Sequence, residues 1–234
     1  MPLRYRCLAI DHDDTSVMST PLIHYPAHVE ALRRIRPGRE PIGLDGWLEK
    51  NFDPGLMGYL RGELGMTDEE LRVADGIWRD RTARTAPDFF PGLLPILAEF
   101  KERGGLLVVI SHSDARNIER DYRAALAGPG GAAPGGAAPS GQMPDLVFGW
   151  DDDPERRKPN PYPLREAMRI LGLGPSDVLV LDDLKPGADM AQAVGADFAA
   201  AGWGHSIPRI REAMLARAKY YLRRVEELEP VLLG

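Results

Sequence analysis

Residues 10–15 are Ile10-Asp11-His12-Asp13-Asp14-Thr15, and they directly follow the apolar run Cys7-Leu8-Ala9. A short apolar run that ends in an acidic, turn-prone segment is typical of a buried strand that stops at the edge of a parallel sheet. Asp11 and Asp13 are two residues apart on extended chain, so their side chains leave from the same face and His12 is expected to pack beneath them. Two carboxylates on one face can divide a reaction, one attacking and the other moving protons.

Two further apolar runs end in polar residues. Leu106–Ile110 is followed by Ser111, and Val178–Leu181 is followed by Asp182 and Asp183. Weaker strand candidates are residues 146–148 and 198–200. Continuous apolar strands alternating with amphipathic helices predict an α/β fold, a doubly wound parallel sheet covered on both faces. Ligands of such sheets bind where the strands end, so the polar side chains are expected to share one crevice.

About ninety residues separate the first two strands, which is far more than one crossover helix needs. The span is helical in character and rich in arginine. We therefore expect a catalytic core of residues 1–17 and 91–234 and an inserted α-helical cap of residues 18–90. The best helix of the insert is 67–84, with Thr67 as N-cap and Glu70 at the capping-box position.

Three other segments carry structural expectations. The small core of the insert is expected to contain Trp47, Phe52, Met57 and Trp78. Residues 208–228 alternate charged and apolar side chains and predict one amphipathic surface helix. Residues 127–141 are nearly all Gly, Ala and Pro, which predicts a flexible surface loop.

The composition fits a globular enzyme, with 44% hydrophobic and 27% charged residues among 234. The net charge of −6 argues against a general nucleic-acid binder. The single cysteine, Cys7, excludes an internal disulfide and favours a reducing compartment. The chain shows neither a signal peptide nor an apolar run long enough to cross a bilayer, so we expect a cytoplasmic protein without membrane partners.

The acidic cluster also predicts a metal. Asp11, Asp13, Asp182 and Asp183 would repel one another unless a hard cation lay among them. Mg²⁺ suits this set, because it takes carboxylates together with water and substrate phosphate. It would also allow an anionic carboxylate to approach an anionic phosphoryl group.

Four segments resemble, in order, the motifs of the haloacid dehalogenase superfamily. Residues 10–15 resemble the first motif, a hydrophobic strand followed by Asp-x-Asp-x-Thr. The second to fourth motifs are resembled by Val108-Val109-Ile110-Ser111, Lys158-Pro159-Asn160-Pro161 and Val180-Leu181-Asp182-Asp183. The match runs from Leu8 to about Gly204, and the insert resembles the helical cap of the family's first cap class. The resemblance implies a Rossmann-like core.

The resemblance also implies roles for these residues. Asp11 would be the nucleophile, and Asp13 would act first as general acid and then as general base. Ser111 would hydrogen-bond the phosphoryl oxygens, and Lys158 would neutralise them while pairing with Asp11. The Mg²⁺ ligands would be Asp11, the main-chain carbonyl of Asp13, Asp182 and Asp183.

The implied activity is Mg²⁺-dependent hydrolysis of a small phosphorylated metabolite through an aspartyl-phosphate on Asp11, by a monomer or homodimer. A sugar-phosphate phosphomutase would share every core residue, and a catalytically inactive relative that binds a phosphate ligand is a further alternative. The family usually has glycine where this chain has Asp14, and many relatives have Asp-Ser where it has Met18-Ser19.

Other readings fit the residues less well. A haloacid dehalogenase proper needs neither Asp13 nor the pair Asp182 and Asp183. A phosphonatase uses a lysine of the cap, and Lys50 is the only lysine of this insert. A phospho-accepting receiver domain carries its aspartate after the third strand and has no large insert after the first.

Overall fold

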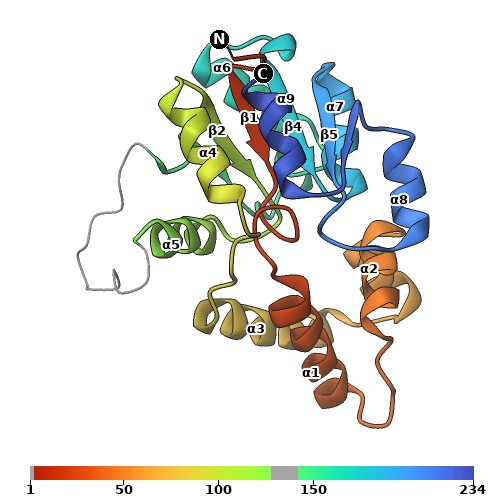
Figure 1. Ribbon diagram of the computed structural model, residues 1–234. Helices are drawn as coiled ribbons and strands as arrows, with labels where there is room; N and C mark the ends of the chain where they lie inside the picture. The colour runs from red at the N-terminus through yellow and green to blue at the C-terminus, as the bar shows by residue number, and fades with distance from the viewer. Residues whose placement is uncertain (1–2, 128–141) are drawn as a thin grey trace.

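The computed structural model describes residues 3–127 and 142–234, which contain a six-stranded parallel sheet flanked by helices (Figure 1). The strands are β1 (Cys7–Ile10), β2 (Leu106–Ile110), β3 (Leu146–Phe148), β4 (Val178–Asp182), β5 (Asp197–Ala201) and β6 (Tyr220–Leu222). Every pairing in the sheet is parallel. The predicted α/β class is confirmed.

The strand order is β3-β2-β1-β4-β5-β6. β1 lies between β2 and β4, and Ile10 is in register with Val109 on one side and Leu181 on the other. From β1 the chain winds outward to β3, and from β4 it winds outward in the other direction to β6. The switch point, where doubly wound sheets bind ligands, therefore lies between β1 and β4.

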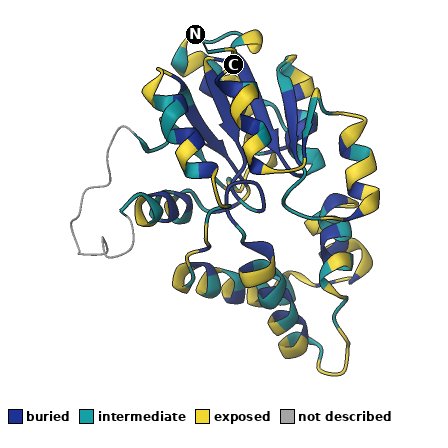
Figure 2. Cartoon of the chain, in the orientation of Figure 1, coloured by how far each residue is buried: buried dark blue, intermediate teal, exposed yellow. Residues whose placement is uncertain are grey.

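Alternate residues of the strands face two separate apolar clusters. Leu8 and Ile10 belong to the cluster beneath α4 (Leu93–Glu102), α5 (Ala115–Leu126) and α9 (Glu229–Leu232). Cys7 and Ala9 belong to the opposite cluster. The helices of that face are α6 (Tyr162–Leu171), α7 (Lys185–Val194) and α8 (Pro208–Leu215). Figure 2 shows the strands buried and the outer helix faces exposed, as expected when both faces of a parallel sheet are covered.

Between β1 and β2 the chain is helical. The elements are η1 (Thr20–His24), α1 (Tyr25–Ile35), α2 (Leu44–Phe52), η2 (Gly58–Glu63) and α3 (Asp68–Arg84). The predicted N-terminus of α3 is confirmed: the Glu70 amide donates to Thr67 Oγ1 over 3.2 Å, and the Thr67 amide donates to Glu70 Oε2 over 2.8 Å. The division of the chain into a core and a cap remains a prediction.

The expected core of the insert is only partly correct. Trp47 does pack inside the insert. Phe52, however, packs in the cluster on the Cys7 and Ala9 face of the sheet, and Met57 is exposed. Trp78 is half-buried and packs, as expected, against a cluster of insert residues that includes Ile77, while its indole N–H bonds His24. Apolar character predicts burial, but it does not indicate which neighbour covers the side chain.

The single helix expected over residues 208–228 is wrong. Helix α8 ends at Leu215, and Tyr220–Leu222 then form β6 beside β5. The chain continues as η6 (Val225–Leu228) and α9. If residues 220–222 were helical, the backbone N–H and C=O groups at the edge of β5 would have no partner. Pairing with β6 satisfies these groups.

Two linkers run side by side: the first, residues 11–19, joins β1 to η1, and the second, residues 85–92, joins α3 to α4. The Met18 amide donates to the Asp88 carbonyl over 2.9 Å, and the Phe90 amide donates to the Ser16 carbonyl over 3.0 Å. Val17 and Phe89 form an isolated antiparallel bridge. Each linker is therefore held by the other.

Two remaining expectations concern the loop and the membrane. The loop predicted at 127–141 lies, except for Ala127, outside the described residues. Among the helices of the described residues, none combines the length and apolar character needed to cross a bilayer.

Candidate active site

The carboxyl ends of β1, β2 and β4 bring the predicted site residues together. Asp11 follows β1, Ser111 follows β2, and Asp182 and Asp183 stand at the end of β4. Lys158 reaches the same place from the segment before α6: its Nζ lies 2.7 Å from Asp11 Oδ1 and 2.6 Å from Asp182 Oδ2. Residues that are distant in sequence thus meet at the switch point of the sheet.

Asp11, Asp182 and Asp183 form a buried acidic triad. One ligand atom from each lies within 4.8 Å of the other two. Burial, with a contribution from the charge of Asp11, raises the pKa of Asp182 to about 6 even though Lys158 opposes the shift. Burial and the charge of Asp182 likewise raise the pKa of Asp183. Lys158 alone does not balance three carboxylates, so this donor set fits a hard divalent cation.

Asp13 lies beside the triad, and its carboxylate faces other partners. Its Oδ1 lies 2.8 Å from His24 Nε2. Its Oδ2 accepts hydrogen bonds from Ser113 Oγ at 2.6 Å and Ser111 Oγ at 3.4 Å. Burial alone would raise the pKa of this carboxyl, but His24 and Ser113 stabilise the carboxylate and hold the pKa below its ordinary value. The Asp13 side chain is thus separate from the triad, and its implied metal contact through the main chain stays a prediction.

His24 and Trp78 supply a connection that the sequence did not reveal. Trp78 Nε1 donates to His24 Nδ1 over 2.8 Å. Because an indole N–H can only donate, Nδ1 accepts, and Nε2 therefore carries the hydrogen that faces Asp13. Trp78 is on α3 and His24 ends η1, so no local spacing pattern relates either residue to Asp13.

Ser111 and Lys158 are also held by neighbours. Ser111 Oγ accepts the Ser113 amide at 3.1 Å, and the N-cap of α5 is Asp114. His112 Nε2 lies 2.8 Å from the Lys158 carbonyl. Burial, together with the charge of Lys158, lowers the pKa of His112 to about 4, so the ring is neutral and donates to that carbonyl.

Asp14 occupies a strained position in place of the glycine that the resemblance suggests. Its φ is 55°, in the left-handed region that disfavours side chains. Its Oδ1 accepts the Thr20 amide at 3.0 Å, which ties the turn to the first residue of η1. Burial raises the pKa of this carboxyl to about 6.

Thr15 joins the turn to β4. Its Oγ1 accepts the Asp183 amide at 3.1 Å and donates to Asp183 Oδ1 over 3.2 Å. Trp203 Nε1 donates to the Thr15 carbonyl over 3.0 Å. The threonine therefore orients one carboxylate of the triad, a role that the first motif alone did not specify.

The sequence of residues 5–195 matches the family model of the haloacid dehalogenase-like hydrolases. The chain belongs to this family. No curated protein matches the haloacid dehalogenase-like chain in sequence.

Solved structures share the fold of this haloacid dehalogenase-like hydrolase over nearly its whole length. A putative phosphoglycolate phosphatase from Lactobacillus plantarum superimposes with a TM-score of 0.73 at 20% identity, covering 99% of this chain and 100% of that one. A predicted phosphatase from Clostridium acetobutylicum has a TM-score of 0.74 at 18% identity, covering 97% of each chain. CbbY from Rhodobacter sphaeroides in complex with phosphate has a TM-score of 0.68 at 19% identity, covering 96% of each.

Proposed function

We propose that this hydrolase cleaves a small phosphate monoester with the help of Mg²⁺, through an aspartyl-phosphate on Asp11. The observation that supports this most is the bridge of Lys158 between Asp11 and Asp182, beside a buried acidic triad. A lysine in this place neutralises a carboxylate that must approach an anionic phosphoryl group. Two of the solved structures of similar fold are described as phosphatases, and a third binds phosphate.

In the first step, the Asp11 carboxylate attacks phosphorus and the bond from phosphorus to the leaving oxygen breaks. Asp13 donates a proton to that oxygen. In the second step, Asp13 takes a proton from water, whose oxygen attacks the aspartyl-phosphate and releases inorganic phosphate. His24 and Ser113 favour the carboxylate form of Asp13, which the second step needs, so the first step requires Asp13 to gain a proton beforehand.

The surrounding residues position and neutralise the reacting groups. Lys158 reduces the negative charge of Asp11, and Ser111 lies beside Asp13 where it can hydrogen-bond a phosphoryl oxygen. Mg²⁺ held by Asp11, Asp182 and Asp183 would add positive charge at the phosphoryl oxygens. Since phosphoryl transfer depends mainly on positioning and charge, these contacts are the ones on which the proposal relies.

The test is phosphate release from a panel of phosphate monoesters, with Mg²⁺ or with EDTA. We expect release only with Mg²⁺ and a loss of at least about 10³-fold in Asp11→Asn, because the covalent step has no nucleophile. Asp80→Asn, at an exposed position of α3, is the matched control and should keep full activity. Acid quenching during turnover should trap phosphate on Asp11.

The alternatives predict different outcomes. A sugar-phosphate phosphomutase would be phosphorylated on Asp11 and would move the group within a bisphosphate without releasing phosphate. An inactive relative would bind phosphate and never become phosphorylated.

Since the free thiol of Cys7 is buried and unpaired, we also propose that the hydrolase works in a reducing cytoplasm.

A further inference from the structure

His12 stands between Asp11 and Asp13, but its ring lies in a separate buried environment. The residue is 1% exposed, as expected for a side chain packed beneath the site. Its ring centroid lies 6.3 Å from that of Phe89 in the second linker and 6.1 Å from that of Tyr122 on α5. Its Nε2 lies 3.2 Å from Asp121 Oδ2. The turn of residues 11–17, which carries Asp11 and is called the nucleophile turn below, is thus anchored to α5 through a residue that takes no part in the proposed chemistry.

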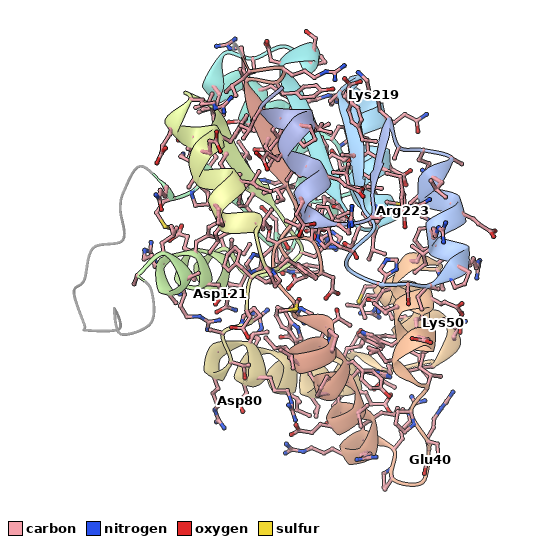
Figure 3. The ribbon with its side chains drawn as sticks, in the orientation of Figure 1. Glu40, Lys50, Asp80, Asp121, Lys219 and Arg223 are labelled. Atoms are coloured by element: carbon pink, nitrogen blue, oxygen red, sulfur yellow. The ribbon has the colours of Figure 1, made fainter. Side chains whose placement is uncertain are left out.

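Asp121 is a buried carboxylate with two partners. It is 4% exposed, and Figure 3 shows it on α5, at the side of that helix that faces α3. One oxygen faces His12, and the other accepts hydrogen bonds from Arg120 Nε at 2.9 Å and Nη2 at 2.7 Å. A carboxylate is kept in such a position only when it is paired, so the three side chains depend on one another.

Arg120 extends this network to the inserted helices. Its Nη1 donates to the carbonyls of Thr82 at 2.8 Å and Ala83 at 3.2 Å, and its Nη2 donates to that of Thr85 at 3.3 Å. These carbonyls belong to the last turn of α3 and its C-cap, which have no partners within the helix. Arg120 therefore fastens the end of α3, where the second linker begins, to α5.

The second linker returns to the nucleophile turn through the backbone. Phe90 bonds the Ser16 carbonyl, and the amides of Ser16 and Val17 donate to the His12 carbonyl at 2.9 and 3.0 Å. The end of α3 is therefore connected to the turn by two routes, one through the linker backbone and one through three side chains. A displacement of α3 relative to α5 acts on His12 by both routes.

We propose that Arg120, Asp121 and His12 form a side-chain relay that positions Asp11 and Asp13 according to the placement of the inserted helices. The three are positioning residues, since they act through the backbone of the turn. A nucleophile has to be held within about 0.5 Å and 10–20° of its productive geometry, which a loosened turn cannot do. The kinetic part of this proposal rests on the proposed phosphatase function, whereas its structural part does not.

The kinetic test compares four variants. His12→Leu removes the donor to Asp121 and His12→Gln retains one, while Arg120→Met removes the guanidinium but keeps an apolar stem. Arg123→Met is the matched control, because Arg123 is an exposed arginine of the same helix that pairs with Glu119. We expect kcat to fall about 10- to 100-fold in His12→Leu and Arg120→Met with KM changed less than about threefold, and the control to stay within about twofold.

Two further comparisons separate positioning from general stability. His12→Gln should recover most of the loss of His12→Leu. The double variant His12→Leu/Arg120→Met should lose no more than the worse single variant, because both interrupt one relay. Fully additive losses, or a KM effect without a kcat effect, would overturn the proposal.

Hydrogen exchange tests the relay without any substrate. In Arg120→Met, the amides of Ser16 and Val17 should exchange about tenfold faster, while the amides of β1 and β2 keep their wild-type rates. Unchanged exchange at Ser16 and Val17, or an equal acceleration throughout the sheet, would overturn the relay. If the wild type releases no phosphate, the proposed function fails and the exchange result still decides on the relay.

Discussion

The carboxyl edge of the sheet and the helices inserted between β1 and β2 differ in where they keep charge. At the edge, Asp11, Asp182, Asp183 and Lys158 are all less than 8% exposed, and Lys158 offsets part of the negative charge. In the insert, ion pairs such as Lys50 with Glu63 lie at the surface, and the interior is built from aromatic and aliphatic side chains. Surface pairs contribute little to stability, whereas breaking a buried pair is costly. The edge should therefore tolerate few changes and the insert many.

Lys158→Met should have the largest effect of the changes that separate the two regions. It leaves three buried carboxylates without their cation, which we expect to cost about 3–5 kcal/mol and to abolish phosphate release. Thermal unfolding should show that Mg²⁺ stabilises this variant more than the wild type. Lys101→Met is the control, because Lys101 is a half-buried lysine paired with Asp145 away from the site, and its loss should leave the Mg²⁺ effect unchanged. An Mg²⁺ effect no larger than that of the wild type would contradict the assignment of the triad.

Glycine substitutions should have opposite signs in the two regions. A Cβ at Gly187 of α7 would lie 2.3 Å from Asp182 Oδ2, so Gly187→Ala should displace that carboxylate, lower stability by about 1–3 kcal/mol and raise the Mg²⁺ concentration needed for activity. A Cβ at Gly76 of α3 meets nothing within 4 Å. Gly76→Ala should stabilise the protein by about 0.5–1 kcal/mol. Denaturant unfolding of both variants measures the difference, and equal signs would contradict it.

His28 is a buried titratable side chain inside the insert. Its ring stacks on Trp47 with centroids 4.2 Å apart, and burial lowers its pKa to about 4. The imidazole of His28 takes up a proton near pH 6.5 in the unfolded chain and near pH 4 in the folded chain. Stability is therefore lost as the pH falls between these values, by about 3 kcal/mol. Denaturant unfolding at pH 7.5 and pH 4.5 should show a smaller loss in His28→Phe. The same loss in both proteins would exclude His28 as the cause.

The two regions meet at the hydrogen bond from Trp78 to His24, where we expect the smallest effect. Trp78→Phe keeps an aromatic ring but removes the donor that fixes the His24 tautomer. The loss of one such hydrogen bond, about 1 kcal/mol, should lower kcat about fivefold. Steady-state kinetics on the best monoester measures this change, and an unaltered kcat would show that Asp13 does not depend on that tautomer.

The difference between the sheet edge and the insert also explains what could be predicted from the sequence. A polar residue at the end of an apolar run can be recognised from the sequence alone, and Asp11, Ser111 and Asp182 each stand at the end of a strand in this way. Lys158 does not directly follow a strand, and only the resemblance of its Lys-Pro segment to the third motif indicates its role.

Other features depend on contacts between distant segments. The contacts from Trp78 through His24 to Asp13 join two helical elements to the nucleophile turn. Nothing in the sequence around Trp78 or His24 marks either residue as a partner of Asp13. Residues 220–222 become a strand only because the edge of β5 is free to pair with them. The expected place of Phe52 in the core of the insert is wrong for the same reason, since its neighbours come from α8.

The place of Lys158 in the chain has a consequence for the newly made protein. Asp11 directly follows β1, which is translated well before the lysine partner and the adjoining strand β4. Burying the ionised Asp11 carboxylate without its counter-charge is costly. Enclosure of the carboxyl end of β1 is therefore favoured only after Lys158 has been made. A nascent chain that stops before residue 158 should consequently depend on chaperones rather than enclose Asp11.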